Sequence, residues 1–250
     1  MESMTVAHEV KDQIQQIGGG FMFSREAKEF GRSTGVDGFI GPYMRGRCGV
    51  LGEVDADVVT AAAGFFPADS VRAAWESVAM PAAEAARGYA LAAQQFGVRK
   101  LASFDGAERL AELMEAVAAN ADPAGVPLFA GWRAVPLPAD PRARVLQLTH
   151  VLRELRGGVH LVAVKSQGVS PRDAVLIAGS PLASGPDQAA LYGWPAPYTA
   201  PGEDVRARWA RAEEITDELA SQAFDVLDET EGKELVTLLA DANAAVFPAR

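Results

Sequence analysis

The sequence predicts an all-α protein, with at most minor β wings, that folds as one compact body. Three observations predict this class. Apolar residues recur at helical spacing through most of the chain, turn residues separate these runs, and alternating patterns typical of strands are scarce. The chain has 250 residues, of which 49% are hydrophobic and 22% charged, so it is long and apolar enough to bury a large core.

The expected helices follow one another along the chain between prolines and glycines. They cover residues 58–66, 71–78, 82–96, 107–121, 142–167, 171–178, 205–227 and 230–246. Asp105 stands three residues before Glu108, which predicts an N-cap for the helix that follows. A proline-rich connection over 123–141 and a turn-rich segment over 179–202 interrupt the pattern, and any short wing would lie in such segments.

The second half of the chain repeats features of the first. Residues 51–59 resemble 167–175, the helix over 82–96 corresponds to 205–219, and Phe104-Asp105 corresponds to Phe224-Asp225. The offset drifts from about 116 to 122 residues, as loop insertions would produce. We therefore predict two related halves, 1–133 and 134–250. The alternative is that two alanine-rich helical stretches align loosely.

Both halves carry segments that resemble a known family of tandem, MarR-like winged-helix proteins. The segments are Phe23 to Ala27, Arg45 to Val59, Phe65-Phe66-Pro67 with Trp75, Arg153 to His160, and Gly193-Trp194-Pro195. These helix-turn-helix proteins are mostly uncharacterised and common in actinobacteria. The composition of this chain agrees with such a source, because only five of its 23 basic residues are lysine, as is typical of a high-GC genome. The resemblance implies a single-chain pseudo-dimer of two winged-helix-like halves. Such folds serve both repressors and recruited enzymes. Members often carry histidine where Leu155 stands, so no chemistry is assigned to that position.

The helix over 142–167 is the most informative segment for function. It is apolar on opposite sides, which predicts a buried central helix. It nevertheless carries five polar residues that must be paired or meet a ligand: His150, Arg153, Glu154, Arg156 and His160. They predict either a structural network between the halves or the polar wall of a cavity. In the cavity, the two arginines would bind an anionic group and either histidine would be the candidate acid–base group.

Further candidates stand in the first half, just before the turn at Leu51-Gly52. Tyr43, Arg45 and Arg47 could face the same cavity, although solvated arginines at a helix end are an equal alternative. Cys48 is better read as a buried, inert thiol than as a nucleophile. A metal site is disfavoured because the histidines and Glu154 span too wide an arc. The chain has no dinucleotide-binding or phosphate-binding glycine motif, so we expect no cofactor.

The net charge of −10 argues against a nucleic-acid partner. The expected recognition helices also carry few side chains that could contact bases or phosphates. The helix over 69–78 has Arg72 as its one cation, and the helix over 187–191 has Gln188 and no cation. The favoured function is binding of a small-molecule, anionic ligand without DNA, in a protein that could be an enzyme recruited to bacterial secondary metabolism. A MarR-type DNA-binding regulator and a protein–protein adaptor are the alternatives. Without a signal peptide or a long apolar run, we expect a cytoplasmic monomer or homodimer and no membrane partner.

Overall fold

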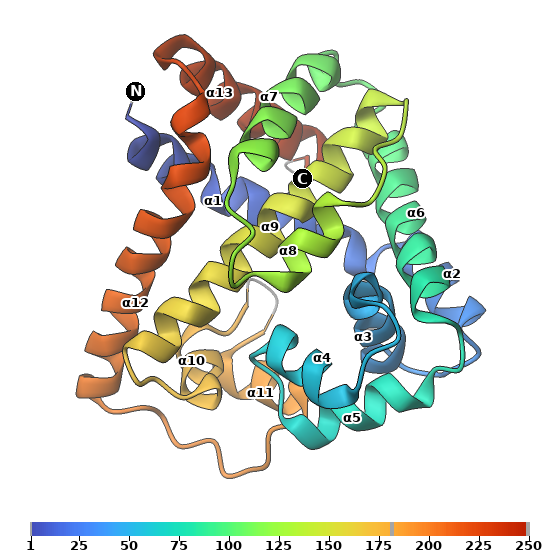
Figure 1. The fold of residues 1–250 in the computed structure, drawn as a ribbon, viewed down its shortest axis with the longest axis vertical. Helices are drawn as coiled ribbons and strands as arrows, with labels where there is room; N and C mark the ends of the chain where they lie inside the picture. Colours follow the sequence, from blue (N-terminus) through green and yellow to red (C-terminus); the bar gives the residue numbers. More distant parts are fainter. Residues whose placement is uncertain (1, 181–182, 249–250) are drawn as a thin grey trace.

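The structure is a computed structural model that describes residues 2–180 and 183–248. Within these residues every regular element is helical and no sheet is present; the one pairing of extended backbone is an isolated bridge between Ser180 and Ala183. The all-α prediction is confirmed, and the described part of the chain contains no β wing. Figure 1 shows helices of both halves packed around a long helix, α9, in the middle of the molecule.

The first half contains eight α-helices and two 3-10 turns within the described residues. They are α1 (Ser3–Gly20), η1 (Phe21–Phe23), α2 (Arg25–Ser33), α3 (Ile40–Cys48), η2 (Gly49–Leu51), α4 (Ala56–Ala63), α5 (Ala68–Ser77), α6 (Ala82–Lys100), α7 (Ala107–Asn120) and α8 (Pro127–Arg133). The proline-rich connection thus contains a helix, because Pro127 stands in its first turn, where a missing N–H costs nothing. The predicted Asp105 cap is wrong: Gly106 occupies the N-cap of α7 and no side chain caps it.

The second half contains five α-helices and one 3-10 turn in its described residues. They are α9 (Pro141–Ser166), α10 (Pro171–Ala178), α11 (Gly185–Tyr192), α12 (Glu203–Ser221), η3 (Gln222–Val226) and α13 (Glu229–Val246). Side chains of Asp140, Ser170, Ser184 and Asp228 accept hydrogen bonds from the first backbone N–H groups of α9, α10, α11 and α13. The capped helices α9, α10 and α13 begin within one residue of their predicted starts, whereas α11 lies inside the segment over 179–202 that was predicted to be rich in turns.

Helix α9 is the centre of the fold. It packs against α1, α6, α7, α8 and α12, so both halves cover it. Val145, Leu146 and Leu148 lie on different sides of the helix and all are buried. Gly18 lets α1 approach closely, because a Cβ there would stand 2.8 Å from the carbonyl oxygen of Thr149. The prediction of a central helix that is apolar on opposite sides is therefore confirmed.

Two series of helices occur in the same order. Helices α4 to α7 have 8, 10, 19 and 14 residues, and α10 to α13 have 8, 8, 19 and 18. Phe104 lies between α6 and α7, and Phe224 lies in η3, between α12 and α13. This agreement supports the division into halves 1–133 and 134–250, which we retain as a proposal.

The short helix pairs of the two series, α4–α5 and α10–α11, pack against each other. The indole Nε1 of Trp194 donates to the carbonyl oxygen of Phe65 at 3.0 Å. The rings of Phe66 and Tyr192 have centroids 3.9 Å apart. Gly193, at the end of α11, stands so close to Ser70 in α5 that a Cβ would collide with its hydroxyl. The two helix pairs are therefore joined directly.

Because helices of both halves bury α9, neither half should fold alone. We expect residues 134–250, expressed by themselves, to lack a cooperative thermal transition in circular dichroism, since α9 would expose the apolar faces that α1, α6 and α7 cover. Co-expression with residues 1–133 should restore the transition. A cooperative melt of the isolated half would contradict this prediction.

Candidate functional site

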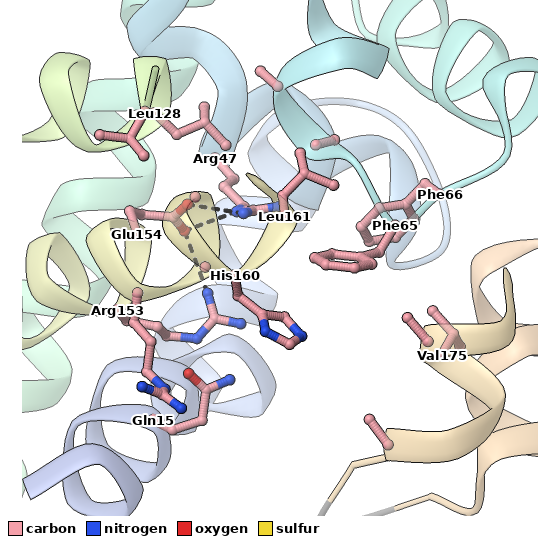
Figure 2. Close-up of a pocket in the computed structure, with 18 of the residues that line it drawn as sticks. Gln15, Arg47, Phe65, Phe66, Leu128, Arg153, Glu154, His160, Leu161 and Val175 are labelled. Atoms are coloured by element: carbon pink, nitrogen blue, oxygen red, sulfur yellow. Dashed lines mark hydrogen bonds and ion pairs between the residues drawn. The ribbon is translucent and has the colours of Figure 1, made fainter. Parts of the chain in front are cut away.

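A cavity of about 370 Å³ lies between the two halves, with walls from α1, α3, α4, α8, α9, α10, α11 and α12. Phe65, Phe66 and Val175 form an apolar side, while Leu128 and Leu161 stand nearer Arg47 (Figure 2). The other side presents the polar residues of α9. Figure 2 shows Arg47 and Arg153 approaching Glu154, while Phe65, Phe66 and Val175 stand across the cavity.

The polar wall is organised around the carboxylate of Glu154, which is 1% exposed. Arg47, on α3, donates to both carboxylate oxygens from Nε and Nη2, each at 2.8 Å. Burial alone would raise the pKa of Glu154, but the charge and hydrogen bonds of Arg47 outweigh burial and lower the pKa to about 2. Glu154 is therefore a fixed anion that is already paired.

Among the arginines of this wall, Arg153 makes the fewest hydrogen bonds to groups of the described residues. Its Nη1 lies 3.3 Å from the Glu154 oxygen that also accepts from Arg47. Its Nε is buried and has no hydrogen-bond partner among the described residues. Two guanidinium groups thus share one carboxylate, which leaves about one unit of positive charge at the cavity wall.

Arg156 and His160 also line the cavity, but α12 occupies the guanidinium of Arg156 and one ring nitrogen of His160. Arg156 pairs with Asp217 at 2.7 Å and with Glu213 at 3.2 Å. The Nδ1 of His160 lies 3.0 Å from the hydroxyl of Thr216, and burial lowers the pKa of His160. The two residues therefore take part in a network within the second half, which differs from the network between the halves that the sequence offered as an alternative, and they also form part of the cavity wall.

The remaining candidates separate into two groups. Tyr43 lines the cavity. Arg45 lies outside it, bonded to Glu53 at 2.8 Å and stacked over Trp75 at 4.2 Å. The Cys48 thiol is buried, and burial raises its pKa to about 12, which agrees with an inert thiol.

His150 also lies outside the cavity, in a cluster of aromatic rings. The rings of Phe21, Tyr89 and Trp132 surround it at centroid distances of 4.6 to 5.7 Å. Burial lowers the pKa of His150 to about 4, because the surrounding rings cannot solvate a charge. The structure therefore does not bring His150 and His160 together at one site.

The sequence reading missed several cavity residues. Phe65 and Phe66 stand at the α4–α5 turn, and Lys11 and Gln15 come from α1, which was not among the expected helices. A signal for α1 exists, because Val6, Val10, Ile14 and Ile17 recur every three or four residues, and all four are buried.

The chain matches a family described as a helix-turn-helix family over residues 7–250 and belongs to it. The short pairs α4–α5 and α10–α11 are its helix-turn-helix candidates. Neither a curated protein nor a solved structure matches the chain. No helix in the described residues combines the length and apolar character needed to cross a bilayer.

The buried His150 should make stability depend on pH between about 6.5 and 4. In this range the unfolded chain binds a proton at His150 that the folded protein, with a pKa of about 4 there, does not. The neutral His150 therefore does not lower the free energy of unfolding above about pH 6.5, and this free energy falls by up to about 3 kcal/mol as the pH drops to 4. Urea unfolding at a series of pH values measures this loss.

His150→Leu should remove most of that slope, leaving the smaller loss from His160, whereas His8→Gln, at an exposed histidine, should keep it. The buried carboxylate of Glu154, whose pKa is lowered from 4.5 to about 2, adds a loss of stability that begins near pH 4.5 and is complete only below pH 2. An unchanged slope in His150→Leu would show that His150 is not the titrating group.

Proposed function

We propose that the protein binds a small anionic molecule with an apolar body in the cavity between its halves. The observation that carries this proposal is Arg153, whose Nη1 shares a carboxylate that Arg47 already holds at 2.8 Å and whose buried Nε has no partner in the part of the chain that the structure describes. A guanidinium with unused donors beside a cavity favours a carboxylate, sulfonate or phosphate group.

The shape of the cavity agrees with a ligand of this kind. Its volume of about 370 Å³ falls in the range of small-molecule sites. Phe65, Phe66 and Val175 offer an apolar surface across the cavity from Arg153 (Figure 2), so the anionic end and the apolar body of one molecule can each contact a matching wall. Binding is the proposed activity; His160 is the histidine that lines the cavity, should a reaction accompany it.

The same proposal includes the loss of sequence-specific DNA binding. Arg72, the cation of α5, is paired with Asp57 and lies 3.5 Å from Glu76. Gln188, the candidate reader on α11, is buried and lines the cavity. Neither helix therefore offers a free side chain suited to reading bases or phosphates.

The spacing of the two helices also argues against DNA binding. Paired recognition helices enter successive major grooves about 34 Å apart. Here α5 and α11 have 10 and 8 residues, so they are about 15 and 12 Å long. Because Gly193 stands against Ser70, their centres lie within roughly 20 Å of each other. Two adjacent grooves cannot be read from this arrangement.

The alternative function is a DNA-binding regulator. It is favoured by membership in a helix-turn-helix family and by the presence of two short helix pairs in the chain. In this arrangement, DNA binding would require α10–α11 to separate from α4–α5, with loss of the Trp194 to Phe65 hydrogen bond.

Arg153 should decide the affinity for anions. We expect wild-type protein to bind anilinonaphthalene sulfonate, an aromatic anion, with saturable fluorescence. Arg153→Met should weaken this binding by about 10- to 100-fold, because charge-assisted hydrogen bonds are lost while the apolar stem is retained. Arg211→Met, at an exposed arginine paired with Glu214, is the matched control.

Thermal melts of the same variants test the structural alternative. If Arg153 serves the ligand, Arg153→Met melts within a few degrees of wild type. A melting temperature lowered as far as expected for a broken buried ion pair, together with unchanged dye affinity, would refute the proposed site.

DNA should not be retained specifically. Gel-shift assays with the protein's own upstream region should show no discrete complex at physiological salt, and any weak binding at low salt should be unaffected by Arg72→Ala, because that side chain is already paired. Nanomolar binding with a steep salt dependence would favour the regulator instead.

A further inference from the structure

One ring nitrogen of His160 is open to the central cavity. The side chain lines the cavity and is 18% exposed, and Figure 2 shows its ring extending from α9 into the space toward Phe65 and Val175. Its Nδ1 lies 3.0 Å from the hydroxyl of Thr216 on α12. Among the described residues Nε2 has no hydrogen-bond partner, and it is not one of the buried polar atoms that lack a partner. This atom is therefore within reach of a molecule in the cavity.

The hydrogen bonds of Thr216 fix which ring nitrogen carries the proton. The Thr216 hydroxyl is fully buried and donates its one proton to the carbonyl oxygen of Ala212 at 2.7 Å. It can therefore only accept from His160, so Nδ1 is the donor. A carboxylate oxygen of Glu213, 3.5 Å from Nδ1, is also an acceptor. In the neutral ring the proton thus lies on Nδ1, and Nε2 keeps its lone pair.

The surroundings of His160 favour a neutral ring in one orientation. Burial lowers the pKa of His160 and the charge of Arg156 acts in the same direction, whereas the carboxylates of Glu213 and Asp217 act against them. The ring of Phe65 packs against the imidazole, with centroids 5.6 Å apart and planes at 30°. Because α12 holds Nδ1 and Phe65 holds the ring, Nε2 cannot turn easily away from the cavity.

Space for a ligand lies between Arg153 and His160. The two residues are seven positions apart on α9, close to two full turns, so they project from the same face with Cα atoms about 10 Å apart. Gly157 lies between them on that face and lines the cavity, and a Cβ there would meet no atom within 4 Å. One molecule can therefore lie over Gly157 and reach both side chains.

We propose that the ligand of the central cavity is an anion whose apolar body carries a hydroxyl group, and that this hydroxyl donates to Nε2 of His160 while the anionic group binds Arg153. The inference rests on the proposed function, because it adds a second polar contact to the same ligand. A hydroxyl fits better than an ammonium group, since two guanidinium groups that share Glu154 already leave positive charge at this wall. His160 thus selects hydroxylated anions over analogues that leave Nε2 without a partner.

Two naphthalene sulfonates that differ by one hydroxyl test this inference on the full chain. The probes are 6-hydroxynaphthalene-2-sulfonate and naphthalene-2-sulfonate, and isothermal titration calorimetry measures their affinities. We expect the hydroxylated compound to bind about 3- to 10-fold more tightly, because it gains one hydrogen bond.

Variants of His160 separate the hydroxyl contact from the rest of the site. In His160→Asn the amide can still donate to Thr216 but offers no acceptor where Nε2 stands. The preference for the hydroxylated compound should therefore vanish, while the affinity for naphthalene-2-sulfonate changes little. His160→Gln, whose amide oxygen reaches the position of Nε2, should keep part of the preference. His8→Gln, at an exposed histidine outside the cavity, should keep all of it.

Nitrogen-15 NMR of the imidazole rings reports the position of the proton directly. The neutral ring of His160 should show a protonated Nδ1 and an unprotonated Nε2, and the loss of its signals in His160→Asn identifies them. A proton on Nε2 would overturn the inference, because that atom could then only donate.

Filling the space over α9 tests where the ligand lies. Gly157→Met should fold, because its Cβ meets no neighbour and methionine favours a helix more than glycine does. The variant should lose binding of both sulfonates, since its side chain occupies the space between Arg153 and His160. Unchanged affinity would contradict this position of the ligand.

Failure of this inference can be told apart from failure of the proposed function. Equal affinity of wild type for the two sulfonates, with both weakened by Arg153→Met, would overturn the hydroxyl contact and leave the anion site in place. A preference that survives in His160→Asn would do the same. If neither sulfonate binds, or if Arg153→Met alters neither affinity, the proposed function is refuted and this inference with it.

Discussion

The buried pair of Glu154 and Arg47 is the interaction on which the rest of the structure depends. It joins α3 of the first half to α9 of the second with two hydrogen bonds of 2.8 Å. The carbonyl oxygen of Arg47 also accepts from Trp132 at 2.9 Å, so α8 is held to the same point. Removing one charge would leave the other buried and unpaired, at a cost of about 3–5 kcal/mol. The pair fixes the polar wall of the cavity and the contact between the halves together.

Helical periodicity was sufficient to predict most of the fold. The run over 142–167 is apolar on opposite sides, and the structure buries it as α9 between both halves. The same rule would have revealed α1, which was overlooked. Helix α8 could not be read in this way, because its seven residues are too few to show a period and they lie among prolines. The prediction of an Asp105 cap was wrong because the helix begins one residue later than the spacing indicates, with Gly106 at the N-cap, and local sequence does not fix a helix end to a single residue.

The candidate site was harder to predict, because sequence gives the direction of a side chain on its helix but not the partner it meets. Arg153, Arg156 and His160 share a face, and all three line the cavity. Yet α12, more than fifty residues away along the chain, supplies carboxylates to Arg156 and leaves Arg153 short of partners. Arg45 and Arg47 differ by two positions and therefore point to different sides of α3, one away from the cavity and one into it.

Tyr43 belongs to the wall of the central cavity and also to that of a second cavity, of about 650 Å³, among α2, α3, α6 and the end of α11. Its ring stacks on Phe39 with centroids 5.1 Å apart and lies 6.1 Å from the ring of Phe66. A displacement of this ring would change the shape of both spaces at once, because the same ring lines each of them. By thermodynamic linkage, molecules in the two spaces would then alter each other's affinity by the same factor. One aromatic side chain is thus the point at which occupancy of one space would be felt in the other.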